Sequence, residues 1–162
     1  MIGYLLLGSN LGKRIAHLEH GIELLKDKHV KIIRKSSIYE SEPWGLSNQP
    51  WFLNICLEIE WDKTPRELLE ICLVSEEMIG RTRFKKWGPR IIDIDILYLG
   101  NNIISSPELV VPHPQIPNRR FTLGPLVELA SGFVHPENGL NQMELLNRCK
   151  DKLQVRSLEI VK

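Results

Sequence analysis

Apolar residues recur along the chain with two different spacings, and each spacing predicts one kind of element. Residues 2–8 form a continuous apolar run that predicts a buried first strand. From about Gly12 to Lys26 apolar side chains return every three or four residues, which predicts a helix. Two β-rich stretches, Val30–Glu40 and Phe52–Trp61, predict a second and a third strand, separated by a loop over residues 41–51.

A second helix is predicted by several agreeing signals at its two ends. Thr64 is a suitable N-cap, Pro65 fits the first helical position and Glu67 completes a capping box. The helix then runs to about Ile79, where Gly80 provides a C-terminal stop.

The C-terminal half is predicted to contain one further long strand and several shorter elements. The strand covers residues 91–99, and Asn101-Asn102 predicts a tight turn into a short returning strand. A Pro-rich loop over residues 107–117 follows, then a helical piece that ends near Ala130 and a helix from Asn141 to about Cys149.

The order of these elements, βαββαβ, is typical of the ferredoxin-like fold. We therefore predict the α+β class, with helices on one face of an antiparallel sheet and helical additions at the C-terminus. The other face of the sheet would be left free for loops and a ligand. A length of 162 residues suits a single domain over residues 1–162.

Composition adds mainly exclusions. An apolar fraction of 43% and a charged fraction of 25% are ordinary for a soluble globular protein. The net charge of +1 gives no steering toward nucleic acid or a membrane, so electrostatic function must come from local clustering. The three cysteines form no CxxC pair. Cys56 and Cys72 lie in apolar contexts, so we expect buried, reduced thiols in a cytoplasmic protein. The N-terminus does not resemble a signal peptide, and no apolar run could span a bilayer.

Two aspartates interrupt the apolar strand at residues 91–99. Strand geometry would put Asp93 and Asp95 on one face, roughly 6.5 to 7 Å apart, and the apolar side chains on the other. Carboxylates at this spacing can converge on a metal pair about 3.5 to 4 Å apart, and Mg²⁺ often uses only one or two carboxylates together with phosphates. The alternative is a surface strand whose aspartates pair with nearby lysines. The face opposite the aspartates is expected to carry Ile92, Ile94, Ile96 and Tyr98.

A basic segment precedes this strand and contains no acidic residue. Because Arg90 is three residues from Asp93, this positive charge must lie beside the aspartates, which suits a polyphosphate held by arginines and Mg²⁺. The alternative is a solvated basic loop. Trp87 could stack on a base or heterocycle, or anchor the loop in the core. The basic side chains are those of Arg81, Arg83, Lys85, Lys86 and Arg90.

A second candidate surface is the aromatic segment at residues 41–54. Trp44, Trp51 and Phe52 could form a stacking slot, and Asn54 offers donors and an acceptor to a heteroaromatic amide edge. The alternative is a loop that tucks its apolar side chains into the core. No P-loop, protein-kinase, zinc or nucleophile-elbow motif is present.

Several segments together resemble the 6-hydroxymethyl-7,8-dihydropterin pyrophosphokinase family of folate biosynthesis. WGPRxxDxDI is the most specific of them. The resemblance implies transfer of the β,γ-diphosphate of ATP to the hydroxymethyl group of the pterin, with release of AMP. We also expect a monomer that binds neither nucleic acid nor membrane. The matching segments are LGSNLG at 7–12, QPWFLN at 49–54, GRTR at 80–83, WGPRIIDIDIL at 87–97, VPHP at 111–114 and NRRFTLGPLVELA at 118–130.

The resemblance also implies roles for individual residues. Asp93 and Asp95 would hold two Mg²⁺, and Arg81 and Arg90 would stabilise the transferring group. Asp95 is also the candidate for orienting the substrate hydroxyl, since no other general base stands out. Positions that match ATP contacts are Glu76, Arg83, Trp87, Arg90, His113 and Arg119. Positions that match the pterin site are Ser41, Pro43, Trp44, Phe52, Asn54 and Phe121, with Phe52 and Phe121 as the stacking pair.

Two other functions stay open on the residues alone. Another two-metal nucleotidyl transferase would also use paired aspartates and a basic loop, but would release pyrophosphate. A ferredoxin-like RNA-binding module would need aromatic segments on its central strands and a broad basic face. Neither feature is evident in the sequence.

Overall fold

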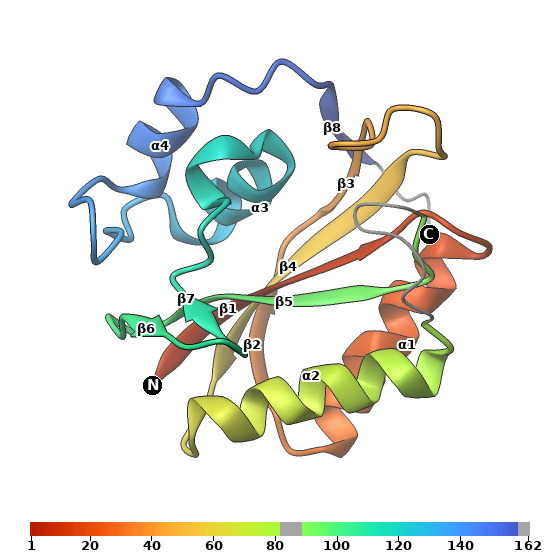
Figure 1. Cartoon of the computed structure of the whole chain (residues 1–162), viewed down its shortest axis with the longest axis horizontal. Helices are drawn as coiled ribbons and strands as arrows, with labels where there is room; N and C mark the ends of the chain where they lie inside the picture. Colours follow the sequence, from red (N-terminus) through yellow and green to blue (C-terminus); the bar gives the residue numbers. More distant parts are fainter. Residues whose placement is uncertain (82–88, 159–162) are drawn as a thin grey trace.

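The computed structural model describes residues 1–81 and 89–158. At its centre lies an antiparallel sheet with the strand order β5-β1-β4-β3-β8, in which β2 also pairs with β4 (Figure 1). A small hairpin of β6 and β7 lies apart from this sheet. The bounds are β1 (Ile2–Ser9), β2 (Lys31–Lys35), β3 (Ile38–Ser41), β4 (Phe52–Glu60), β5 (Asp93–Leu99), β6 (Ile104–Ser105), β7 (Val110–Val111) and β8 (Val155–Leu158).

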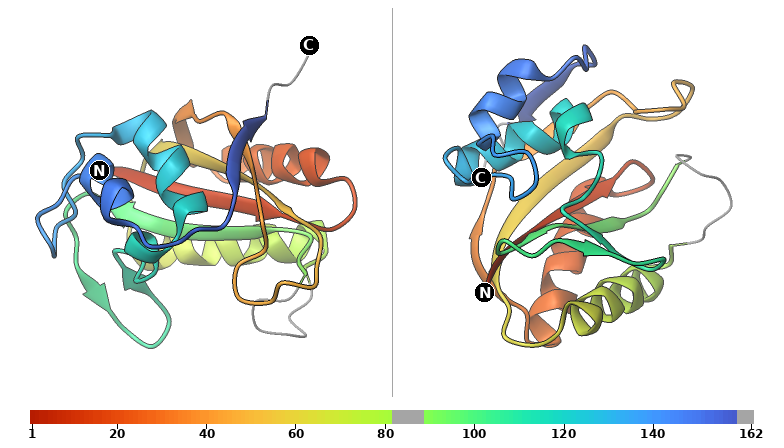
Figure 2. Two further views of the ribbon diagram at one scale, coloured as in Figure 1. Left: turned by 90° about the horizontal axis from the view of Figure 1, so that it is seen from above. Right: turned by 60° about the vertical axis from the view of Figure 1, so that its left-hand side comes forward.

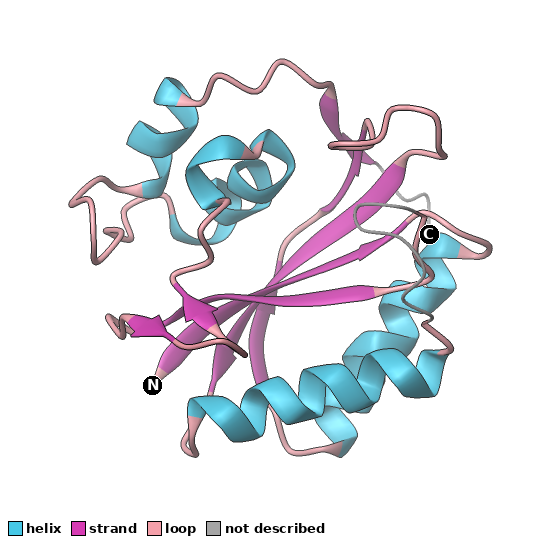
Figure 3. Ribbon diagram, in the orientation of Figure 1, coloured by secondary structure: helices cyan, strands magenta, loops and turns pink. Residues whose placement is uncertain are grey.

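Helices lie on both sides of the sheet, as Figures 2 and 3 show. The first pair lies on one side and encloses the larger apolar core, which contains Leu5, Leu57 and Ile94. The second pair lies on the other side over a smaller core around Tyr4 and Tyr98. The helices are α1 (Arg14–Asp27) and α2 (Pro65–Ile79) in the first pair and α3 (Arg120–Ala130) and α4 (Gln142–Arg148) in the second, and η1 (Ile116–Asn118) is a 3₁₀ turn.

This arrangement confirms the predicted α+β class with an antiparallel βαββαβ sheet and C-terminal helical additions. The expectation that the second face would be free is correct for only part of it. The helical additions cover the part that carries Tyr4, Leu6 and Cys56. The part near Asp93 and Asn54 is left to the loops. In the described ranges no helix is long and apolar enough to cross a membrane.

The ends of α2 follow the sequence prediction closely. The Thr64 side chain accepts a hydrogen bond from the Glu67 amide at 3.1 Å, and the Glu67 carboxylate accepts one from the Thr64 amide at 2.9 Å. Gly80 ends the helix in the left-handed region, with φ of 110°. This end delivers Arg81 to the edge of the sheet beside β5.

The predicted strand over residues 30–40 is instead two strands, β2 and β3, which both pair with β4. Ser36 lies between them and is buried. Its amide donates to the Cys56 carbonyl and its hydroxyl accepts from the Cys56 amide, both at 2.9 Å. A side-chain oxygen thus replaces a carbonyl in the ladder, which lets the chain bend between the two strands.

The prediction that Tyr98 shares a face with Ile92, Ile94 and Ile96 is wrong. Tyr4 pairs with Tyr98 and Leu5 with Ile96, so one extra residue of β5 forms a bulge. Since side chains alternate along a strand, the extra residue moves Tyr98 to the second face. There its ring lies 4.7 Å from that of Phe133, centroid to centroid.

The C-terminal strand β8 was not predicted from the sequence. It pairs antiparallel with β3 and forms an outer edge of the sheet. Its four residues are too few to show a clear alternation, and their pairing depends on a partner more than a hundred residues away.

The expectation that Cys56 and Cys72 are buried free thiols is confirmed.

Candidate active site

The register of three central strands brings polar side chains into one row across the second face. Gly8 of β1 pairs with Asn54 of β4 on one side and with Asp93 of β5 on the other. In the next row Leu6 lies between Cys56 and Asp95. The strands therefore hold both aspartates on the face opposite α1 and α2.

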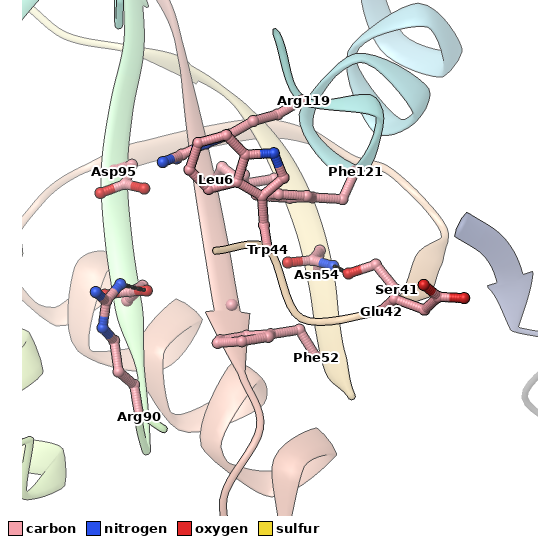
Figure 4. Close-up of a pocket in the computed structure, with 12 residues that line it drawn as sticks. Leu6, Ser41, Glu42, Trp44, Phe52, Asn54, Arg90, Asp95, Arg119 and Phe121 are labelled. Atoms are coloured by element: carbon pink, nitrogen blue, oxygen red, sulfur yellow. Dashed lines mark hydrogen bonds and ion pairs between the residues drawn. The ribbon is translucent and has the colours of Figure 1, made fainter. Parts of the chain in front are cut away.

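A hollow opens over this row, and we call it the aromatic hollow (Figure 4). Phe52 and Phe121 lie on opposite sides of it, with Asn54 between them. The buried Asn54 amide donates to the Ser41 hydroxyl at 2.8 Å, which fixes the orientation of the amide. The lining residues are Leu6, Gly8, Ser41, Glu42, Trp44, Phe52, Asn54, Arg90, Asp93, Asp95, Arg119 and Phe121.

The floor of the aromatic hollow depends on the absence of a side chain at Gly8. A Cβ atom there would lie 3.1 Å from Asn54 Oδ1 and 3.6 Å from Phe52 Cδ1. Alanine would crowd the Asn54 amide oxygen, and a longer side chain would also push against the ring. Gly8 therefore leaves room for a flat ligand between the strand backbone and the aromatic side chains.

Most residues predicted for the pterin are brought together here. Pro43 is not among the lining residues, and neither is Trp51, which had been considered for the stacking slot. Arg119, predicted as an ATP contact, lies in this hollow, with its guanidinium carbon 4.6 Å from the ring of Trp44 and 5.6 Å from that of Phe121. Its buried Nε atom has no hydrogen-bond partner in the part of the chain that the structure describes.

A second hollow lies on the other side of Asp95, between α2, β5 and the β6–β7 hairpin. It contains Glu76 and His113, both predicted as ATP contacts, together with Arg81. Asp95 is the one residue that lines both hollows in the described ranges, so it forms part of the wall between them. The lining residues are Leu69, Leu73, Glu76, Arg81, Ile94, Asp95, Ile96, Glu108, Leu109, Val110, His113 and Pro114.

The two aspartates differ sharply in their ion pairs. Asp93 pairs with Arg90 Nη1 at 2.6 Å and with Arg81 Nη1 at 2.8 Å. Among the residues that the structure describes, no ion pair reaches Asp95. Burial and the mutual repulsion of the two carboxylates raise the pKa of this pair, and the arginines oppose that effect.

Two titratable groups in the second hollow have shifted pKa values. Burial raises the pKa of Glu76 to about 7, against the opposing effects of Arg81 and of the Ile94 amide, which donates to the Glu76 carboxylate at 2.8 Å. Burial and the nearby Arg119 charge lower the pKa of His113 to about 4. His113 Nδ1 accepts from the Gln115 amide at 3.1 Å, which suits a neutral ring with its proton on Nε2.

Asn10 links the segment before β5 to the end of the loop before β4, although sequence reasoning assigned it no role. Its Oδ1 accepts from the Arg90 amide at 2.7 Å, and its Nδ2 donates to Gln49 Oε1 and to the Pro50 carbonyl, both at 2.9 Å. The backbone N–H of Asn10 also donates to the Arg90 carbonyl at 3.0 Å. A buried asparagine directly after a strand, within the LGSNLG segment, was the available signal.

The predicted ATP contacts Arg83 and Trp87 lie outside the described residues. Within those residues no group of three or more histidine, cysteine or acidic side chains could hold a metal ion. Two aspartates on one strand face nevertheless fit Mg²⁺, because this ion takes hard oxygen ligands and usually keeps water and phosphate oxygens in its shell.

Comparison with known proteins gives matches over most of the chain. Residues 4–131 match the family model described as 7,8-dihydro-6-hydroxymethylpterin-pyrophosphokinase (HPPK). Proteins named 2-amino-4-hydroxy-6-hydroxymethyldihydropteridine pyrophosphokinase are 42% identical over 132 residues in Methylorubrum extorquens, covering 81% of this chain and 84% of that one. The corresponding values in Bacillus subtilis are 43% over 129 residues, 79% and 77%.

Solved structures show the same fold. An HPPK-DHPS protein in complex with substrates superposes with a TM-score of 0.73 at 15% identity. The match covers 90% of this chain but only 42% of that structure, so this chain spans less than half of it. From the sequence match and the two related enzymes, this chain belongs to the 7,8-dihydro-6-hydroxymethylpterin-pyrophosphokinase family.

Proposed function

We propose that this chain, as a single domain, transfers the β,γ-diphosphate of ATP to the hydroxymethyl group of 6-hydroxymethyl-7,8-dihydropterin in folate biosynthesis. The hydroxymethyl oxygen forms a bond to the β-phosphorus of ATP. The bond from that phosphorus to the oxygen bridging the α-phosphate breaks, AMP leaves with this oxygen, and the hydroxyl proton is released to solvent. The observation that carries the proposal is that two hollows of different character meet at Asp95.

The aromatic hollow suits the pterin. Phe52 and Phe121 would stack on the two faces of the bicyclic ring, as flat rings prefer. The Asn54 amide and the Ser41 hydroxyl would meet its polar edge, since both are buried and already held by their mutual hydrogen bond. Trp44 would close the outer side, and Pro43 would shape the loop behind it.

The second hollow suits the nucleotide. Leu69, Leu73 and Val110 supply an apolar wall for a base. Glu76 and a neutral His113 would contact the nucleotide there, Arg119 would reach its phosphates from the aromatic hollow, and Arg83 and Trp87 would add contacts from the basic segment. The phosphates would then lie beside Asp95, next to the pterin hydroxymethyl group.

Where the two hollows meet at Asp95, this chain's own arginines and aspartates supply the charge. Asp93 and Asp95 would hold two Mg²⁺ ions, which when bound neutralise phosphate oxygens. Arg81 and Arg90, now paired with Asp93, would exchange part of that pairing for the transferring diphosphate. Asp95 would also orient the hydroxyl group, because it belongs to both hollows.

The test is an assay of products. The purified chain with ATP, Mg²⁺ and the dihydropterin is expected to release AMP and form the pterin diphosphate, as a monomer and under the reducing conditions of cytoplasm. Release of pyrophosphate instead of AMP would favour the alternative two-metal nucleotidyl transferase. An Asp95→Asn variant serves as the control for contaminating kinases.

A further inference from the structure

Trp51, the last residue before β4, is held on two sides by segments distant in sequence. Arg14, at the start of α1, donates from Nη1 to the Trp51 carbonyl at 3.0 Å. The Arg156 guanidinium lies over the Trp51 ring, 5.5 Å from its centroid. Phe52, the next residue, lines the aromatic hollow.

Glu40 connects the two arginines. Its Oε2 atom lies 3.1 Å from Arg14 Nη1, and its Oε1 atom accepts from Arg156 Nη2 at 2.5 Å. The Glu40 side chain is only 13% exposed, whereas that of Arg156 is 65% exposed. The three charged side chains and the indole ring therefore form one cluster, which we call the Trp51 clamp: Arg14, Glu40, Trp51 and Arg156.

The segment that carries Arg156 also holds the other end of the same loop. Ser41 pairs with Val155 in the β3–β8 ladder, and the Glu42 amide donates to the Gln154 carbonyl at 3.1 Å. Figure 1 shows β8 beside β3 and close to the loop that leads into β4. Residues 154–156 thus contact the loop at both its start and its end.

The part of this bracing that residues 154–156 supply lies outside the range that matches the family model, which ends at residue 131. We propose that Arg156 is a positioning residue for the pterin. It acts through Trp51 and Glu40 to hold Phe52 in the geometry that stacks on the ring. The inference rests on the proposed function, because it concerns the substrate of that same hollow.

If the Arg156–Glu40 ion pair served only to stabilise the fold, pterin affinity would not depend on it. An exposed pair contributes little to stability because solvent screens it and its side chains lose freedom. Removing Arg156 should therefore leave the unfolding midpoint nearly unchanged under either interpretation. Pterin affinity separates the two, because a loosened Trp51-Phe52 segment must be reordered each time the ligand binds.

The experiment measures calorimetric dissociation constants of the dihydropterin, in the presence of Mg²⁺ and a non-hydrolysable ATP analogue. For Arg156→Ala we expect the pterin Kd to rise about twofold to tenfold, the range of a lost cation–π contact, with the Kd of the analogue alone unchanged. Arg156→Lys, which keeps the charge opposite Glu40, should recover part of the affinity. The matched control is Arg66→Ala, an arginine 82% exposed and paired with Glu70 on α2, which should change neither constant.

A double variant tests the route. If Arg156 acts through the indole ring, Arg156→Ala should add no further loss in a Trp51→Ala background. An unchanged pterin Kd in Arg156→Ala, an equal rise in Arg66→Ala, or a full additional loss in the Trp51→Ala background would each overturn the inference. A wild-type chain that binds no dihydropterin would overturn the proposed function as well, whereas wild-type binding with an unaffected Arg156→Ala variant would overturn this inference alone.

Discussion

The two aspartates of β5 share a face but have opposite electrostatic surroundings. Asp93 balances two guanidinium groups, and Asp95 is partly buried without an ion pair among the described residues. Removing the Asp93 charge would take from Arg90 its ion pair with Asp93 and would leave Arg81 paired with Glu76. Removing the Asp95 charge would relieve repulsion and desolvation in the free protein.

Substitution of the two residues should therefore affect stability in opposite directions and activity in the same direction. We expect Asp93→Asn to lower the free energy of unfolding by about 3 kcal/mol, as for a broken buried pair. Asp95→Asn should raise it. Both variants should lose at least about a hundredfold in kcat, because each removes charge organised for the transferring group. Urea unfolding and the AMP assay check this, and a stabilised Asp93→Asn or an active Asp95→Asn would contradict it.

His113 should make stability depend on pH. Its folded-state pKa is lowered to about 4. The unfolded chain therefore binds a proton at His113 near pH 6.5, whereas the folded chain binds it only near pH 4. Its stabilising contribution is thus complete above about pH 6.5 and is lost as the pH falls toward 4. The slope is up to about 1.4 kcal/mol per pH unit, or about 3 kcal/mol over this range.

His113→Asn is the matched variant, because its side-chain oxygen can still accept from the Gln115 amide. We expect the difference in unfolding free energy between wild type and variant to shrink steadily from pH 7 to pH 4 in urea titrations. A difference that stays constant with pH would show that the imidazole does not resist protonation.

At the scale of elements, α2 offers a clean separation of stability from function. Its capping box is at Thr64, and the candidate active-site residues Glu76 and Arg81 lie at the other end. Thr64→Ala should destabilise the protein by about 1 kcal/mol, the usual effect of losing an N-cap. kcat and both KM values should stay at the wild-type level. Thr64→Ser keeps the hydroxyl group, and an equally large loss in this control would rule out the cap as the cause.

Local signals predicted the elements that are determined locally. The capping box at Thr64 and the glycine at position 80 act within a few residues, and both ends of α2 are where the sequence placed them. The bulge that turns Tyr98 to the second face and the strand β8 depend on pairing partners distant in sequence. Apolar spacing carries no information about those partners, so these two features could not be predicted.

The candidate site divides in the same way. Asp93, Phe52 and His113 could be named as candidates because they lie in segments that resemble the family, and the fold places each of them beside one of the two hollows. Asn10 and Arg156 could not be assigned roles, since their importance comes from contacts with loops far away in the sequence. Arg119 was assigned to the nucleotide by resemblance, and only the fold shows it between two aromatic rings of the other hollow.

At the scale of the whole molecule, the shared wall at Asp95 should couple the two ligands. Nucleotide and Mg²⁺ in the second hollow would change the charge that the pterin hydroxymethyl group meets. We expect the pterin to bind more tightly with the ATP analogue than without it, by about 1 to 3 kcal/mol, and the analogue to gain equally from the pterin. Calorimetric titrations in both orders measure this.

The coupling should be much smaller in Asp95→Asn, which removes the charge but keeps the shape of the wall. Thr64→Ala, at a residue that lines neither hollow, provides the control with unchanged coupling. Equal pterin affinity with and without the analogue in the wild-type chain would mean that the two hollows are independent.

The glycine at the floor of the aromatic hollow also bears on drug resistance. A compound that lies flat on the backbone at Gly8 would use the same space as the pterin that we propose binds there. Because even one added carbon there would lie 3.1 Å from the Asn54 amide oxygen, a substitution that excludes the compound would also obstruct the pterin. A resistance mutation at Gly8 would therefore also impair the proposed reaction. This makes the floor of the hollow a contact that an inhibitor could use with little risk of resistance.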